Sequence, residues 1–550
     1  MIRDRRNTAD VNTPYQSEQY PRIGDYLLCV CFGIGLVVID HWAFSRFESA
    51  WMGDAARYIE ATRSFLRGEP FLLHGLDGPA PMRLWPPGYP LLAGLVALSG
   101  LDAPDSALLL AQASVALIPA ACYWAVVPQI GRLAAFCAAA VCVTAPGVLA
   151  YANLVSSDPV FLVVAVLALG ALIRGRFSLC MFLACLGLLI RNSGIALVLS
   201  IGITALLDSP GIQVFRQRCV SLLAGGVAPM LALIGWDLWA LGTLSPYQMP
   251  PSTLGWWTNA RAMGRSIAFD LVPVTSLADV LPSLIIYAAC LALAAVVIVG
   301  AAWRNRFVPV PSRRACFSLG LYFCLGTIMT VTARTRYEWG EIIWARHAAQ
   351  YDWLLLPLAS LAAWPVRAIR PSHVRVVLCA ATVLCLAVRA EDVGSRLIAV
   401  SAARPEVERM VQTGVVEPGG YVRLRQVFHA YRNVTELQFV KIASANGCTI
   451  LSNITDLLVS QYDVTASDIN PSRAIPSSVY AIVTMGPEAG TMPKPPPNKP
   501  QVVIDGLPMG IRVFSDRPET CLAQVKWSYL VGPNRSGEEI TSTPSTGLKR

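Results

Sequence analysis

Long apolar stretches alternate with short polar ones over the first 390 residues of the chain. A helix needs about 20 apolar residues to cross a bilayer. The pattern predicts helices over Asp25–Phe44, Ala107–Val127, Arg132–Tyr151, Pro159–Ile173, Phe177–Ile190, Gly194–Leu207, Val220–Leu244, Leu281–Trp303, Ala315–Val331, Tyr351–Pro365 and Val374–Arg389. Several of these are shorter than a perpendicular span, so we expect half-helices or tilted pairs among them. The corner at Arg191–Gly194 would have to be covered by protein or a watery cavity.

Arginines in the short loops give the predicted orientation. These loops hold Arg132, Arg174 with Arg176, Arg216 with Arg218, Arg304 through Arg314, and Arg367 through Arg375. All of them fall on one side if the N-terminus is cytoplasmic, as the positive-inside rule requires. The sequence therefore predicts an α-helical polytopic membrane protein of about eleven transmembrane helices in the inner (plasma) membrane, with the N-terminus inside and the C-terminus outside.

The pattern changes near residue 390, and this change divides the chain. We predict a cytoplasmic segment over residues 1–23, a transmembrane domain over 24–390 and a small extracytoplasmic α/β domain over 391–550. The last domain is polar, with a proline-rich surface loop. Its predicted elements are a helix over Ser395–Thr413 and strands over Cys448–Ser452, Val479–Met485, Ile511–Phe514 and Leu522–Trp527. Its two cysteines, Cys448 and Cys521, are predicted to form a disulfide if the domain lies outside an inner membrane.

Composition agrees with this membrane assignment. The chain is 54% apolar and 14% charged, whereas a soluble globular protein has roughly 25% charged residues. The net charge of +9 does not indicate nucleic-acid binding, because the arginines lie in short loops between apolar spans. Residues 1–22 are polar and basic and an apolar segment follows at once, so we expect an uncleaved first span without a signal peptide.

The first predicted outward loop, about residues 45–104, is long enough to carry function. Within it the stretch Asp54–Leu66 has a helical pattern, which brings Asp54 and Tyr58 onto one face. A second helix begins after Trp85, with prolines at its start. The apolar residues that follow are too few to span, so this helix is predicted to lie along the membrane surface. The loop thus holds a carboxylate near the bilayer surface.

The order of residues in this loop resembles a known family. Asp54, Tyr58, Leu66 with Gly68, and Pro86-Pro87-Gly88-Tyr89-Pro90 are similar to the first loop of the GT-C superfamily, in the bacterial branch of protein mannosyltransferases and aminoarabinose transferases. Asp158 in Ser157-Asp158-Pro159 resembles that family's second acidic residue. Leu189-Ile190-Arg191-Asn192-Ser193-Gly194 resembles its L-T-R-x-x-G corner. The resemblance covers about residues 25–390.

The resemblance implies a glycosyltransferase that moves a monosaccharide from a polyprenyl-phosphate donor to an extracytoplasmic glycan, lipid or protein by inverting displacement. Asp54 would be the base that takes the proton of the acceptor hydroxyl. Arginines that break the positive-inside pattern would bind the donor phosphate, because the guanidinium fork matches phosphate oxygens. These candidates are Arg191, Arg346, Arg334 and Arg336. The predicted substrate pocket adds Tyr58, Trp85, Tyr89, Asp158 and His347.

Two departures from the family keep alternatives open. Many relatives have an acidic residue after the first Asp, and this chain has Ala55. A divalent metal therefore stays open as an alternative that no paired carboxylate supports, and no metal ligand is predicted. His347 replaces an aromatic residue, so the match there is partial. Asp54 and Asp158 are also ordinary helix-capping residues. The alternative function is a non-catalytic polytopic membrane protein, either a lipid or glycan transporter or an assembly partner.

Overall fold

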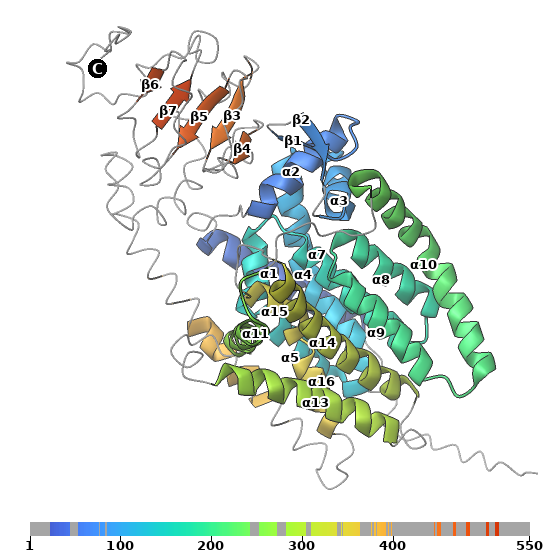
Figure 1. The fold of residues 1–550 in the computed structure, drawn as a ribbon. Helices are drawn as coiled ribbons and strands as arrows, with labels where there is room; N and C mark the ends of the chain where they lie inside the picture. Colours follow the sequence, from blue (N-terminus) through green and yellow to red (C-terminus); the bar gives the residue numbers. More distant parts are fainter. Residues whose placement is uncertain are drawn as a thin grey trace, which may run out of the picture.

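A computed structural model gives the fold. The residues that it describes are 22–44, 53–75, 78–82, 85–242, 252–271, 282–303, 310–337, 343, 345–363, 376, 379–380, 382–384, 386–391, 394, 398, 445, 448–452, 466–468, 480–484, 502–504 and 512–515. They form a helical bundle and a separate sheet near the C-terminus (Figure 1).

Within these residues, five helices are long and apolar enough to cross a membrane. They are α1 (Ile23–Phe44), α4 (Ala103–Ile130), α10 (Ile212–Leu241), α13 (Ser283–Trp303) and α14 (Val310–Arg336). Shorter apolar helices pack beside them: α3 (Gly88–Ala97), α5 (Arg132–Val143), α7 (Asp158–Ile173), α8 (Phe177–Ile190) and α9 (Gly194–Leu207). The predicted bounds of α8 and α9 are confirmed at both ends, so the Arg191–Gly194 corner is a real break between helices.

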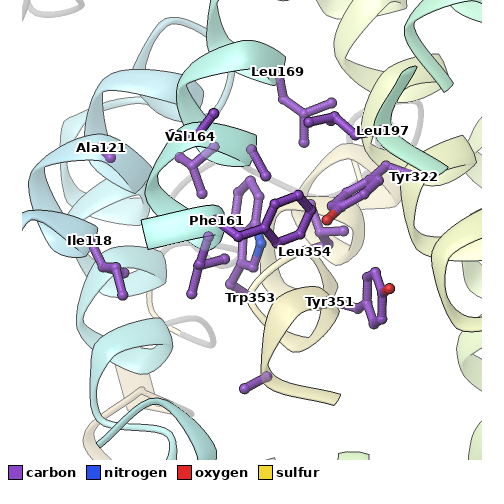
Figure 2. Packing of buried hydrophobic residues seen from close by; sticks show 14 of the residues in the cluster. Ile118, Ala121, Phe161, Val164, Leu169, Leu197, Tyr322, Tyr351, Trp353 and Leu354 are labelled. Carbon is purple, nitrogen blue, oxygen red and sulfur yellow. The ribbon is translucent and has the colours of Figure 1, made fainter. Parts of the chain in front are cut away.

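The bundle has one shared core, which Figure 2 shows from close by. Phe161 of α7, Leu197 of α9 and Tyr322 of α14 meet there and are fully buried. The ring of Tyr322 lies 5.5 Å from that of Tyr351 in an edge contact. In contrast, α10 and α13 expose large apolar side chains such as Val220 and Ile285, which is the surface expected of helices that face lipid.

Two predicted helices are wrong as single elements. The segment Arg132–Tyr151 divides into α5, the short α6 (Pro146–Leu149) and a 3-10 turn, η1 (Ala150–Asn153). Pro146 has no N–H to continue the ladder of α5. The segment Tyr351–Pro365 divides into α15 (Ala345–Asp352) and α16 (Leu355–Ala363). Pro357 cannot donate to the carbonyl four residues earlier, so α15 cannot run on.

The helix α11 (Trp256–Leu271) lies between the predicted helices Val220–Leu244 and Leu281–Trp303 and was missed. It has no continuous apolar run, because its polar face is wide. Its buried residues include Ala260, Met263, Gly264 and Ile267, whose spacing of three and four marks the core face of an amphipathic helix.

The C-terminal sheet has five strands in the order β4-β3-β5-β7-β6. Its strands are β3 (Thr449–Ser452), β4 (Ala466–Asp468), β5 (Tyr480–Thr484), β6 (Val502–Ile504) and β7 (Arg512–Ser515). β3 is parallel to β4 and β5, whereas β7 is antiparallel to β5 and β6. Three predicted strands are confirmed, as β3, β5 and β7. The pattern missed β4 and β6, which have three residues each.

Other predictions for this region fall outside the described residues. They concern the strand Leu522–Trp527, nearly all of the helix Ser395–Thr413, and Cys521. Cys448 is disulfide-bonded, which agrees with the prediction for that residue. Its pairing with Cys521 stays a prediction.

Candidate functional site

The first loop folds into α2 (Gly53–Leu66), a hairpin of β1 (Leu72–Gly75) and β2 (Gly78–Pro81), and α3. They lie together at one end of the bundle, and β1 contacts β4 of the C-terminal sheet (Figure 1). Gly88 explains why α3 can begin here. A Cβ at this position would lie 2.6 Å from the carbonyl oxygen of Leu189. Glycine thus brings the start of α3 against the end of α8, beside the corner with Arg191.

Tyr58 links α2 to the start of α7. Its buried hydroxyl lies 2.9 Å from the hydroxyl of Ser157. Its ring lies 4.8 Å from that of Tyr89 and 6.4 Å from that of Trp85. Tyr89 is fully buried and donates to the carbonyl oxygen of Ala107. Tyr58 and Tyr89 are therefore wall residues whose polar atoms are already bonded.

Asp158 begins α7 and is completely buried. Its Oδ1 accepts a 2.7 Å hydrogen bond from the Gln350 side chain and lies 3.0 Å from Nη1 of Arg191. Its Oδ2 accepts from the Ser156 hydroxyl at 2.6 Å. A buried carboxylate is stable only if it is paired and hydrogen-bonded, and Asp158 meets both conditions.

Arg191 leaves α8 with an extended backbone, which turns its side chain toward α7. Nη1 makes both of its side-chain contacts with described residues, the ion pair with Asp158 and a 3.3 Å hydrogen bond to the Ser157 hydroxyl. The side chain is 21% exposed. Part of the Arg191 side chain is therefore accessible, although its charge is anchored to Asp158.

The charge of Asp54 reaches this group. Burial raises the pKa of the Tyr58 hydroxyl above its usual range, and Asp54 adds to that rise. Burial acts to lower the pKa of Arg191, but Asp158, and to a smaller extent Asp54, hold it above its usual value. Asp54 is half-buried in the first turn of α2. The carboxylate of Asp54 and the guanidinium of Arg191 therefore interact electrostatically near the start of α7.

The other predicted arginines take different positions. Arg346 is buried on α15, and its carbonyl oxygen accepts from the Tyr151 hydroxyl. His347 is also buried, and its Nε2 lies 2.6 Å from Nη2 of Arg334. Arg336 ends α14, exposed, with its guanidinium 5.6 Å from the ring centre of Tyr337. α15 therefore brings Arg334 and His347 together but does not gather all four arginines.

Sequence reasoning missed a second acidic pair. Asp270 of α11 and Asp352 of α15 are both buried, and their carboxyls are close enough for a hydrogen bond. Such a bond requires a proton on one of them. Burial raises the pKa of Asp270 to about 6, against smaller effects from Asp352, the Gly147 N–H and Arg389.

Gln350 and Ser156 were missed as well. Gln350 lies four residues after Arg346 on a helix that packs against α11 and α6. Its one signal in the sequence is a polar side chain just before an apolar run. In the part of the chain that is described, no group of three or more His, Cys, Asp or Glu side chains could hold a metal ion.

The fold is similar to solved structures of ArnT from Cupriavidus metallidurans. The apo state matches with a TM-score of 0.51 and 14% identity, over 90% of this chain and 98% of that one. ArnT bound to undecaprenyl phosphate matches with a TM-score of 0.50 and 13% identity, over the same shares. No protein-family model and no curated protein sequence matches the chain. The predicted fold class, an α-helical polytopic membrane protein, is confirmed, although the number of spans stays a prediction: the chain has apolar helices long enough to cross a membrane and a fold similar to that of ArnT.

Proposed function

We propose that the protein is a membrane glycosyltransferase. Its donor is a monosaccharide linked to polyprenyl phosphate, and its acceptor is an extracytoplasmic glycan, lipid or protein. One observation carries the proposal. Arg191 is anchored to Asp158, with Nη1 3.0 Å from Oδ1; its side chain is 21% exposed, and the charge of Asp54 interacts with its guanidinium. The solved ArnT bound to undecaprenyl phosphate has the same fold, which supports a lipid phosphate as the ligand.

In this mechanism Asp54 accepts the proton of the acceptor hydroxyl as the hydroxyl oxygen attacks the anomeric carbon. The bond from that carbon to the phosphate oxygen breaks, with inversion, and polyprenyl phosphate leaves with its electron pair. Arg191 stabilises the negative charge that develops on the departing phosphate, because it is held in place before the reaction begins. Arg334, Arg336 and Arg346 are the further candidates for phosphate binding.

Asp158 has a different role in this proposal. Both of its oxygens accept hydrogen bonds and it is fully buried, so it anchors Arg191 instead of taking a substrate proton. Tyr58, Trp85, Tyr89 and His347 form the wall near the sugar.

The proposed donor also determines the membrane location and the topology that we propose. Polyprenyl-phosphate donors with an outward sugar require an inner-membrane enzyme with its first loop outside. The N-terminus would then be cytoplasmic, and the domain after about residue 390 would be extracytoplasmic. Contact between β4 and β1 supports a role for that domain beside the first loop, in binding the acceptor.

The test compares Asp54→Asn with Glu69→Gln in membranes that contain equal amounts of protein. Glu69 pairs with Arg67 on the surface of the same loop, and such pairs contribute little. Release of undecaprenyl phosphate is measured from a set of undecaprenyl-phosphate-linked monosaccharides. We expect loss of about 100-fold or more for Asp54→Asn and none for Glu69→Gln. Release by Asp54→Asn equal to that by Glu69→Gln and the unmodified protein would refute the role of Asp54. No release by the unmodified protein from any of these donors would favour a non-catalytic assembly partner.

A further inference from the structure

Gln350 is a residue of α15, and its side chain reaches Asp158 at the start of α7, which pairs with Arg191 at the end of α8. It is buried, and both ends of its amide are used. The amide nitrogen donates to Oδ1 of Asp158 at 2.7 Å. The amide oxygen accepts from the Ser193 hydroxyl at 3.3 Å. Since Ser193 donates to the oxygen, it fixes which end of the amide faces Asp158.

Gln350 donates to Oδ1 of Asp158, and Arg191 forms its ion pair with the same oxygen. The other oxygen accepts from Ser156. An arginine facing a carboxylate with both oxygens available usually binds it through two nitrogens. Here Gln350 and Ser156 already donate to the two oxygens of Asp158, and Arg191 approaches the carboxylate with Nη1 3.0 Å from Oδ1.

We propose that Gln350 is a positioning residue that keeps the Arg191 fork half open for the donor phosphate. The inference rests on the proposed function, because it assigns Gln350 an effect on the same phosphate site. Without the Gln350 amide, Oδ1 of Asp158 becomes fully available to Arg191. The guanidinium then turns toward the carboxylate, and its positive charge is withdrawn from the phosphate.

The experiment measures the Kd for undecaprenyl phosphate with the full chain in nanodiscs. Gln350→Met keeps the length of the side chain and removes both hydrogen bonds. The matched control is Gln129→Met, because Gln129 is also buried and accepts from a serine, Ser312, far along the chain. We expect Gln350→Met to weaken binding on the order of tenfold, the effect of one hydrogen bond to a charged group. Gln129→Met should leave the Kd unchanged.

A purely structural role is separated by two readouts. In an Asp158→Asn background the carboxylate that competes for Arg191 is gone, so Gln350→Met should no longer change the Kd. Gln350→Glu sets a second carboxylate beside Asp158. Its loss of affinity relative to the unmodified protein should grow with pH as the added group ionises. A structural defect would instead persist in the Asp158→Asn background and would not grow with pH.

Different results would refute the phosphate site at Arg191 and the positioning role of Gln350. If Arg191→Gln binds undecaprenyl phosphate as well as the unmodified protein does, the proposed phosphate site is wrong. If Arg191→Gln loses binding while Gln350→Met keeps it, only the positioning role of Gln350 is overturned. An equal loss for Gln350→Met with and without Asp158 would also overturn it.

Discussion

Replacing Asp158 with Asn should make the protein less stable but a better binder of the lipid phosphate. The substitution removes the negative charge 3.0 Å from Nη1 of Arg191. Breaking a buried ion pair by removing one partner costs about 3–5 kcal/mol. Because the Arg191 side chain is 21% exposed, water screens part of this cost, and we expect about 2 kcal/mol. The melting temperature should therefore fall.

The same substitution should raise the affinity for the lipid phosphate, although it lowers the stability of the protein. A carboxylate behind Arg191 repels a phosphate in front of it. For unit charges about 6 Å apart in an effective dielectric of about 20, the repulsion is about 3 kcal/mol. Removing it should tighten binding of undecaprenyl phosphate by at least about tenfold. Tighter binding of the leaving lipid should in turn slow its release during turnover.

The assay pairs a melting curve with the Kd for undecaprenyl phosphate in nanodiscs. Asp25→Asn is the control, because Asp25 pairs with Arg132 through a 2.5 Å contact away from this site. That variant should lose stability without gaining affinity. A folded Asp158→Asn protein with unchanged or weaker binding would refute the reasoning and would make Asp158 a direct ligand or base.

Three other substitutions have defined outcomes. Gly88→Ala should lower the melting temperature, at a cost of about 1–3 kcal/mol, because the new Cβ would lie 2.6 Å from a backbone carbonyl oxygen. Tyr58→Phe removes the bond to Ser157; the melting curve should show a loss of about 1 kcal/mol, with transfer retained. Asp270 has a pKa raised to about 6 by burial, so stability should fall as pH rises from about 4 to 6, by about 3 kcal/mol. Asp270→Asn should flatten that pH profile of the melting temperature.

Apolar periodicity predicted most of the helices because membrane spans are selected by average hydropathy, which is a local property. It failed where local composition and burial disagree. α11 has a wide polar face yet packs its other face in the core. Tyr351–Pro365 is mostly apolar, but Pro357 prevents one continuous helix.

For the candidate site, the sequence indicated several residues but not which side chains they contact. Asp54, Tyr58 and Asp158 were predicted because they match the motifs of the resembling family, and Arg191 because an arginine that breaks the positive-inside pattern beside an apolar span is costly. Gln350 was not, because an uncharged amide costs little in a polar segment before a span. Its importance appears only when α15 folds back and brings it to within 2.7 Å of Asp158, 192 positions away along the chain.

The helix α15 is therefore the element through which the outer parts of the fold act on Arg191. Gln350 ties it to Asp158, and Asp352, two residues later, faces Asp270 on α11. His347 contacts Arg334 at the end of α14. A shift of α15 would alter the anchor of Arg191 and release Arg334 together. Because the eight residues of α15 make these three contacts, we expect a change at the proposed phosphate site to shift α11 and α14 as well.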